Sequence, residues 1–363
     1  MVKVLQVTGS LRVGGLETVA MNCMRYADKD KFQFDFLVFG DQIGEYEEEA
    51  IRSGARIIRI PSPRKSYAQY YRNLCKAIKE NGPYDIVHSH VFFNSGIVML
   101  AAKQCGVPLR IAHAHSARRK SDCGMQKEVF RCVMRHLLIK NATRLCACSQ
   151  SAGDYVFTKR AFRKRGMVLP NVIDTDAFAF SGEARARVRK ELGIEARSTV
   201  LGQVGHLTAA KNQMFLLDVF AAYQKEHPDS VLLLVGDGEL RGQLEQKIET
   251  LGLQRNVRLT GTRLDIGDLL SAIDVYVCTS TNEGFGITLL EAAANGLRVV
   301  VEERVLVEEL KQMTLYQTVF GFEISEWVRC ISAMVNKGRS SSIENSCYSI
   351  KRMPQYIVAL YER

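Results

Sequence analysis

Short apolar runs alternate with longer amphipathic stretches along the whole chain, and this pattern leaves few folds open. Apolar runs of about four to eight residues are typical of strands buried on both faces, and the stretches between them have helical spacing. We therefore predict an α/β protein with two Rossmann-like, doubly wound parallel sheets. The expected strands are Val2–Thr8, Phe34–Phe39, Arg56–Ile60, Asp85–His90, Arg110–His115 and Arg144–Cys148, then Val200–Val204, Val231–Gly236, Val257–Thr260, Asp274–Cys278 and Arg298–Val301.

The length of 363 residues favours two domains. The segment Leu169–Asp174 interrupts the pattern, because Pro170 and Asn171 break regular structure. We predict a first domain of residues 1–170 and a second of residues 171–342, with a C-terminal helix over 343–363 that crosses back onto the first. Open parallel sheets bind ligands beyond the carboxyl ends of their strands, so we expect the site in the gap between the domains.

The chain has a net charge of +10, and its whole basic excess lies in the first domain. Residues 1–170 contain 28 Lys and Arg against 14 Asp and Glu, a net +14, whereas residues 171–363 contain 21 against 25, a net −4. The basic runs Arg118–Lys120 and Lys159–Arg165 are either solvated faces or contacts with an anionic membrane surface, and both interpretations stay open. No nucleic-acid recognition motif or aromatic stacking platform is visible, so nucleic acid is not an expected partner.

The sequence shows no export or membrane-spanning signal. No apolar stretch approaches the roughly 20 residues that cross a bilayer, and Met1–Ser10 has the pattern of a strand. The ten cysteines include no C-x-x-C pair, which favours reduced thiols. The expected location is the cytoplasm, with the inner face of the cell membrane as a docking surface if the basic runs bind lipid.

Glycines follow the first expected strand of each domain. Gly14 and Gly15 precede a helical stretch, where a helix N-terminus can bind phosphate, although the P-loop and G-x-G-x-x-G patterns are missing and a packing turn is the alternative. In the second domain Gly205 is followed by Lys211, with Asn212 as a candidate helix cap. A lysine close to a helix start can neutralise a diphosphate.

Two carboxylates stand eight residues apart in the second domain. Glu283 lies in a loop with Gly284, Phe285 and Gly286, and Glu291 lies in an alanine-rich helix that begins at or just after Gly286. In a continuous helix they would be ~12 Å apart along the axis. That exceeds the ~5–9.5 Å expected of two carboxylates acting on one glycosidic bond. We interpret them as contacts to two ends of one elongated ligand.

In these segments the chain resembles the retaining glycosyltransferases of GT-B fold, specifically glycosyltransferase family 4, along nearly its whole length. Glu283-x7-Glu291 matches the family's Glu-x7-Glu motif, its most specific mark, and Leu169–Asp174 is similar to its interdomain segment. Further similar segments occur in the family's order: Gly14–Glu17, Ile86–His90, Ile111–His115, Gly205–Lys211 and Val235–Leu240.

The resemblance implies a nucleotide-sugar donor. Glu291 would bind the ribose, Glu283 the sugar and Lys211 the diphosphate, while His115, or alternatively His113, would face the reacting sugar. The implied catalytic residues are Lys211, Glu283 and His115. The implied donor-binding residues are Gly14, Gly15, Gly205, His206, Lys211, Gly261, Thr262, Glu283, Gly284, Phe285, Gly286 and Glu291.

Neither a metal nor another cofactor is expected. Breaking a sugar–phosphate bond leaves negative charge on a nucleoside diphosphate, which a preorganised lysine and helix N-termini can stabilise. No Asp-x-Asp signature lies in a suitable loop. His88, His90, His113 and His115 cluster near strand ends, but His-x-His does not fix four metal ligands, so we expect a structural or substrate-facing role.

Three segments depart from the family pattern. His206 stands where the family has an arginine beside its lysine, Leu297-Arg298 replaces a small-residue/Pro step, and the donor loop is Glu302–Glu309, in which Glu308 or Glu309 is an alternative donor contact. We predict a metal-independent retaining hexosyltransferase that acts on a carbohydrate or lipid-linked acceptor in surface-polysaccharide biosynthesis. The alternatives are a nucleotide-sugar epimerase of GT-B fold, which Glu283-x7-Glu291 disfavours, and a catalytically weak partner subunit, to which the departures point.

Overall fold

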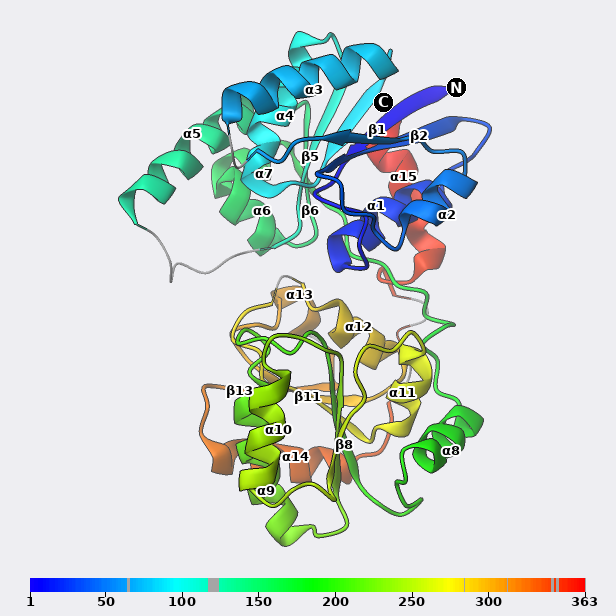
Figure 1. Cartoon of the computed structure of the whole chain (residues 1–363), viewed down its shortest axis with the longest axis vertical. Coiled ribbons are helices and arrows are strands. Elements are labelled where there is room, and N and C mark those ends of the chain that lie inside the picture. Colours follow the sequence, from blue (N-terminus) through cyan, green and yellow to red (C-terminus); the bar gives the residue numbers. More distant parts are fainter. Residues whose placement is uncertain are drawn as a thin grey trace. The chain divides into compact units, whose positions relative to one another are not determined.

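The computed structural model describes residues 1–63, 66–116, 124–283, 285–311, 313–340, 343 and 346–362. The chain divides into two compact units, which Figure 1 shows. Unit 1 comprises Met1–Val172 with Lys351–Arg363, and unit 2 comprises Ile173–Ile350. In the sequence, unit 1 has 31 Lys and Arg against 15 Asp and Glu, a net +16, and unit 2 has 18 against 24, a net −6.

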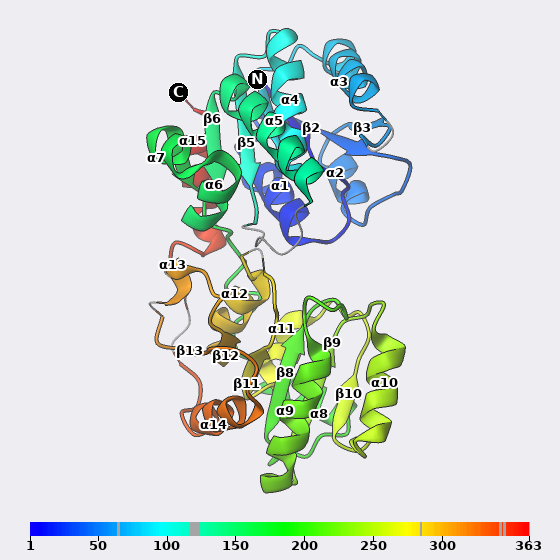
Figure 2. The same cartoon turned by 90° about the vertical axis from the view of Figure 1, so that its left-hand side faces the viewer.

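Unit 1 is built on a seven-stranded parallel sheet with the order β3-β2-β1-β4-β5-β6-β7. Helices cover both faces: α3, α4 and α5 lie on one side, and α1 lies beside α15 on the other (Figures 1 and 2). The strands are β1 (Val2–Val7), β2 (Phe32–Phe39), β3 (Ile57–Ile60), β4 (Ile86–Ser89), β5 (Leu109–Ala114), β6 (Arg144–Ala147) and β7 (Gly166–Val168). The helices are α1 (Gly15–Arg25), α2 (Glu47–Arg52), α3 (Tyr67–Asn81), η1 (Phe92–Asn94), α4 (Ser95–Gln104), α5 (Met125–Asn141), α6 (Gln150–Phe157), α7 (Lys159–Arg165) and α15 (Met353–Tyr361).

Unit 2 has a six-stranded parallel sheet with the order β10-β9-β8-β11-β12-β13. Leu232, Val277 and Trp327 belong to its buried core. The strands are β8 (Val200–Val204), β9 (Val231–Val235), β10 (Val257–Leu259), β11 (Val275–Cys278), β12 (Arg298–Glu302) and β13 (Tyr316–Val319). The helices are α8 (Gly182–Glu191), α9 (Gln213–Glu226), α10 (Arg241–Thr250), α11 (Ile266–Ala272), α12 (Ile287–Ala294), α13 (Glu308–Lys311) and α14 (Ile324–Val335). A short helix, η2 (Ile350–Arg352), begins at the last residue of unit 2, and its other two residues belong to unit 1.

Each sheet reverses its strand order at one point. In unit 1 the reversal lies between β1 and β4, and in unit 2 it lies between β8 and β11. Loops that leave such neighbouring strands in opposite directions open a crevice at the carboxyl edge, where open α/β sheets bind ligands. The two strand-order reversals therefore mark where a site is expected in each unit.

All eleven predicted strands are present, with ends within two residues of the expected positions. The sequence pattern missed β7 and β13, which stand at the outer edges of the two sheets. Edge strands are covered less completely than central ones, so they need no continuous apolar run. In β13 only Val319 is fully buried.

The C-terminal helix is shorter than predicted. It was expected over 343–363, but α15 begins at Met353 and ends at Tyr361. Pro354 occupies the start of the helix, where a missing N–H costs nothing, and Ser349 is held earlier by a β-bridge to Ile173. Residues 351–363 belong to unit 1, and no helix in the described part of the chain is long and apolar enough to cross a membrane.

Candidate active site

An ion pair lies at the strand-order reversal of unit 2. Lys211, in the loop after β8, places its Nζ 2.7 Å from Oε1 of Glu283, in the loop after β11. The Lys211 side chain is 21% exposed and that of Glu283 is 9% exposed. Among the described residues Glu283 takes one of the three ammonium donors, so the group is held in place while it keeps capacity for an anionic ligand.

Gly205 makes room for the lysine. Its φ of +152° is an unfavourable conformation for other residues, and a Cβ at this position would lie 3.1 Å from Cε of Lys211. The side chain of Lys211 therefore runs across the backbone of the first residue after β8. A glycine is required here by both the backbone conformation and the close approach.

Side chains after β11 connect the two loops. Thr279 Oγ1 donates to the carbonyls of Lys211 and Asn212 at 3.3 and 3.1 Å, and the Thr281 N–H donates to the Ala210 carbonyl at 2.8 Å. Ser280 Oγ donates to Oε1 of Glu283 at 2.6 Å. Ser280 is buried, and sequence reasoning missed it because a serine after a strand has no distinctive pattern.

The second carboxylate of the motif lies on α12, which begins at Ile287 as expected. Glu291 is partly buried, and burial raises the pKa of its carboxyl to about 7, while the positive charge of Lys211 opposes the rise. Glu283 and Glu291 do not share one continuous helix, because Gly286 has a left-handed backbone at the N-cap of α12. The predicted axial separation therefore does not apply.

The other predicted residues of unit 2 differ in exposure. His206 and Thr262 are exposed, Gly261 has a φ of +72° beside Arg241, and Phe285 is buried with its ring 5.9 Å from that of Tyr348. Gly284 lies outside the described residues. The burial of Phe285 indicates that its side chain packs into the interior and supports the loop from that side.

Two further expectations concern helix ends and the donor loop. Asn212 occupies the N-cap position of α9, but its side chain makes no cap hydrogen bond, because the backbone there is left-handed. In the predicted donor loop, Glu302 is buried and paired with Arg304, while Glu308 is exposed and pairs with Lys311 at 3.1 Å.

In unit 1 the glycine pair begins α1. Gly14 is the N-cap with an extended backbone, and Gly15 is the first helical residue. A Cβ on Gly14 would lie 2.6 Å from Oε2 of Glu17, whose Oε1 accepts a hydrogen bond from Ser10 at 3.2 Å. Burial raises the pKa of Glu17. The space beside Gly14 thus holds a carboxylate from the first turn of α1.

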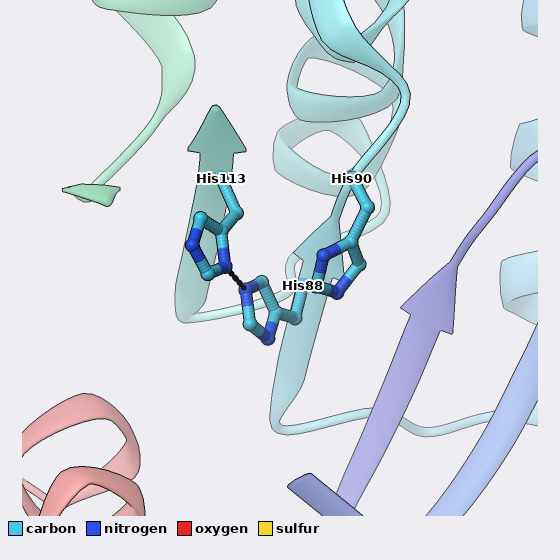
Figure 3. Close-up of side chains that lie close together, drawn as sticks. All are labelled: His88, His90 and His113. Carbon is cyan, nitrogen blue, oxygen red and sulfur yellow. Dashed lines mark hydrogen bonds between the residues drawn. The ribbon is translucent and has the colours of Figure 1, made fainter. Parts of the chain in front are cut away.

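The four clustered histidines lie on and just after β4 and β5, next to the strand-order reversal of unit 1. Figure 3 shows the ring of His88 directed at that of His113, with Nε2 and Nδ1 3.2 Å apart. His90 Nδ1 lies 2.8 Å from His115 Nε2. Burial lowers the pKa of His115 to about 3 and the pKa of the other three well below the usual value, so the cluster is uncharged near neutral pH.

Two residues outside the predicted set complete the histidine cluster. Gln6 Oε1 lies 2.8 Å from His90 Nε2, and Tyr361 Oη lies 2.9 Å from His88 Nδ1. A glutamine within the apolar strand β1 is a signal that sequence reasoning could have used, because buried polar groups require partners. Tyr361 carried no such signal, since a tyrosine on an apolar helix face is common.

Comparison with known proteins gives the class of this fold and site. The model of the family Glycosyl transferases group 1 matches residues 184–312, and that of Glycosyltransferase Family 4 matches residues 13–177. The Bacillus subtilis (strain 168) protein EpsF, named as a glycosyltransferase, is 35% identical over 93% of this chain and 88% of its own length. An Escherichia coli protein named UDP-Gal:alpha-D-GlcNAc-diphosphoundecaprenol alpha-1,3-galactosyltransferase is 30% identical over 74% of this chain and 71% of its own length.

Solved structures give the same fold. Anabaena Alr3699/HepE in complex with UDP and glucose matches with a TM-score of 0.78 at 22% identity, covering 99% of both chains. WaaG, a glycosyltransferase involved in lipopolysaccharide biosynthesis, matches with a TM-score of 0.76 at 16% identity over the full length of both. The protein is therefore a glycosyltransferase of GT-B fold. The chain belongs to glycosyltransferase family 4.

Proposed function

We propose that this glycosyltransferase moves a hexose, with retention of configuration, from a nucleoside-diphosphate sugar to a carbohydrate or lipid-linked acceptor in surface-polysaccharide assembly. The observation that carries the proposal is the Lys211–Glu283 ion pair at the strand-order reversal of unit 2. Glu291, which the charge of Lys211 influences, supplies a second carboxylate on the same edge. A cation and two carboxylates suit a ligand that has both phosphates and hydroxyl groups.

The donor is held in unit 2. Lys211 contacts the diphosphate and stabilises the charge that develops as the sugar–phosphate bond breaks, while Glu283 binds sugar hydroxyls and Glu291 the ribose. Loss of one such preorganised donor typically costs ~2.7–4 kcal/mol of barrier. The HepE structure with UDP and glucose, and the E. coli relative named for UDP-Gal, support a uridine diphosphate hexose.

The acceptor carries a lipid. The E. coli relative is named for a diphosphoundecaprenol acceptor, which would place a sugar close to a membrane. Unit 1 has the matching charge, and α5 exposes Met125, Val129 and Val133, one side chain per turn, at 85%, 59% and 50%. The exposed basic side chains of α7 lie next to the end of α5, because Arg165 donates to the Ile139 carbonyl at 2.6 Å.

We assign the helix pair α5 and α7 to an anionic membrane surface on the cytoplasmic side. Apolar side chains that insert between headgroups and flanking basic groups are the pattern of interfacial binding, with ~1 kcal/mol per basic residue near the surface. The other basic run, Arg118–Lys120, lies outside the described residues. The transfer needs no metal in this proposal, because Lys211 supplies the positive charge.

Donor turnover tests the proposal. The full chain is incubated with labelled UDP- and GDP-sugars, and release of the nucleotide and the anomeric configuration of the product are measured. The expected result is slow release of the nucleotide from one donor when water is the only acceptor, and faster release when the sugar is transferred to a hydroxyl of a lipid-linked acceptor with its configuration retained. Tight donor binding without turnover would instead identify a partner subunit, and an isomerised donor would identify an epimerase.

Vesicle binding tests the membrane contact. Charge reversal of Lys159 and Arg163 should weaken binding to phosphatidylglycerol vesicles by about tenfold or more, because two favourable contacts become unfavourable. The matched control reverses the exposed Lys190 and Lys225 of unit 2, and should leave vesicle binding unchanged. Equal losses in both variants would show a non-specific charge effect and reject α7 as the docking surface.

A further inference from the structure

Six polar side chains of unit 1 form one continuous hydrogen-bonded network, and most of them have no part in the donor or lipid binding proposed above. The network crosses neighbouring strands β1, β4 and β5 and includes Tyr361 on the C-terminal helix. Its members are Gln6, His88, His90, His113, His115 and Tyr361. A neutral histidine ring has one donor and one acceptor nitrogen, so the direction of each contact sets which nitrogen carries the proton.

The Gln6 amide sets the direction. Its Nε2 donates to Oη of Tyr361 at 2.8 Å, which leaves Oε1 facing His90. An amide oxygen can only accept, so Nε2 of His90 carries the proton, and Nδ1 of this neutral ring must accept. His115 Nε2, 2.8 Å away, therefore donates to it. The single ring proton of His115 is thereby used, and its Nδ1 holds a lone pair.

The second arm runs the other way from the same amide. The Tyr361 hydroxyl accepts from Gln6 and lies 2.9 Å from Nδ1 of His88, to which it can donate its proton. In that direction His88 is protonated at Nε2. That N–H donates to Nδ1 of His113, and the proton of His113 lies on Nε2 (Figure 3). One arm thus ends in an acceptor and the other in a donor.

Both end atoms lack a partner. Nδ1 of His115 and Nε2 of His113 are buried and make no hydrogen bond within the described residues. A buried polar atom without a partner is costly, and such atoms require a functional or structural explanation. His115 is the residue of the pair that follows its strand, at the carboxyl edge, where open α/β sheets bind ligands.

We propose that Gln6 and His90 are positioning residues that hold His115 with Nε2 protonated, so that Nδ1 accepts a hydrogen bond from a sugar hydroxyl. This inference rests on the proposed function, to which it adds the role that the family resemblance implies for His115, that of facing the reacting sugar. A bare lone pair binds O–H groups and cannot bind an ionised phosphate oxygen, which has no proton to donate. In this protonation state His115 therefore suits a sugar hydroxyl and not an ionised phosphate oxygen.

The same cluster could be mistaken for a metal centre, because ligand atoms of His88, His90 and His113 lie within 4.8 Å of one another (Figure 3). A metal bound there would need lone pairs on the facing nitrogens of His88 and His113 at the same time. The network instead places a proton between these two nitrogens. Stoichiometric zinc in the purified protein that His88→Ala removes would overturn the inference.

Ring nitrogen NMR of the unmodified full chain is the first test. In protein labelled with 15N-histidine, two-bond proton correlations distinguish the two neutral tautomers, and substitutions assign the signals of the seven histidines. All four network histidines should be neutral and protonated at Nε2 at pH 7. A proton on Nδ1 of His115 would overturn the inference whatever the activity, and this result does not depend on the proposed reaction.

Kinetics of matched variants are the second test. Gln6→Met should shift the ring-nitrogen signals of His115 toward a mixture of the two neutral tautomers. It should also lower kcat about three- to tenfold, the effect of one hydrogen bond, and leave the KM for the donor within twofold of the unmodified value. Tyr361→Phe removes the second arm and also the acceptor that orients the Gln6 amide, so the His88 and His113 signals should change, and those of His115 should move in the same direction as in Gln6→Met. Unchanged His115 signals in Gln6→Met would contradict the proposed chain of contacts.

A double-mutant cycle connects the network to the reaction. Gln6→Met should cause no further loss in a His115→Ala background, because a positioning residue acts only through the residue it holds. Independent, multiplying losses would show a merely structural role and reject the inference. If His115→Ala leaves turnover unchanged while NMR finds Nε2 protonated, the role of His115 in the proposed function fails but the tautomer assignment stands.

Discussion

The carboxyl edges of the two sheets differ in a way that the charges of the units do not suggest. Unit 1 has a net charge of +16, yet the side chains at its strand-order reversal are uncharged histidines joined by hydrogen bonds. Unit 2 has a net charge of −6, yet it holds the partly buried cation Lys211. The chemistry of each edge is thus set locally.

Burial and partners explain the difference. In the histidine cluster the rings lose water and face one another, and both effects lower the pKa of His88, His90 and His113. Lys211 also loses water but forms an ion pair with the carboxylate of Glu283 at 2.7 Å. A net charge spread over a surface steers ligands, whereas a site responds to its nearest groups.

The largest expected effect is that of Lys211→Ala. Turnover should fall by ~10²–10³, because the positive charge that faces the leaving diphosphate is lost. The matched control is Lys247→Ala, which breaks a similar pair with Asp218 (2.6 Å, lysine side chain 22% exposed) away from the strand-order reversal. Steady-state kinetics with the best donor measure both variants. Equal losses of turnover in the two variants would contradict the comparison, because the cation at the carboxyl edge of unit 2 would then have no special role.

The second largest expected effect is a pH dependence of the stability of unit 2, caused by the carboxyl group of Glu291. Its pKa is raised to about 7 in the folded protein, so the folded state binds more protons than the unfolded state between about pH 4.5 and 7, and stability falls as pH rises through that window. Glu291→Gln removes this penalty. At pH 8 it should raise the free energy of unfolding by up to about 3 kcal/mol, and at pH 4 by little.

Urea unfolding at the two pH values measures the Glu291 effect. The control Glu249→Gln alters an exposed carboxylate on α10 and should leave the pH dependence unchanged. A constant difference between Glu291→Gln and the unmodified protein at both pH values would show that the carboxyl titrates normally. Burial of the ionised Glu291 carboxylate would then cost unit 2 no stability, contrary to the comparison.

A smaller effect is expected for Gly205→Ala. The substitution should cost about 1–3 kcal/mol of stability, since the backbone conformation disfavours alanine, and should lower turnover about tenfold by displacing Lys211. Gly193→Ala, at a φ of +62° with open space around its Cβ, should lose stability only. Kinetics and unfolding curves separate these outcomes. Normal turnover in both variants would mean that the close approach of Gly205 does not position the lysine.

The sequence predicted the fold well for a physical reason. Central parallel strands are buried on both faces, so they must be short apolar runs, and β8 (Val200–Val204) was predicted without error. The edge strands β7 and β13 were not predicted, because a partly exposed strand does not need a continuous apolar run. The C-terminal helix was predicted too long, since apolar spacing alone does not reveal that Ser349 is engaged in a β-bridge.

The candidate site was only partly predictable. Lys211 and Glu283 were both named from local patterns, but no spacing rule joins residues 72 positions apart. Ser280, Gln6 and Tyr361 were missed because each gains its role from a partner outside its own segment. Phe285 was expected at the ligand, which stays a prediction, and its side chain is buried in the structure.

By itself the sequence determined the class of fold and the residue types at the strand ends, because periodicity and turn chemistry are local properties of the chain. Only the tertiary structure decided which of those residues meet. Strand order brings β8 next to β11 and so joins Lys211 to Glu283, and the return of α15 brings Tyr361 to Gln6, 355 positions away. Hydrogen-bond direction and protonation depend on these contacts between distant segments, and for that reason they appear only in the folded chain.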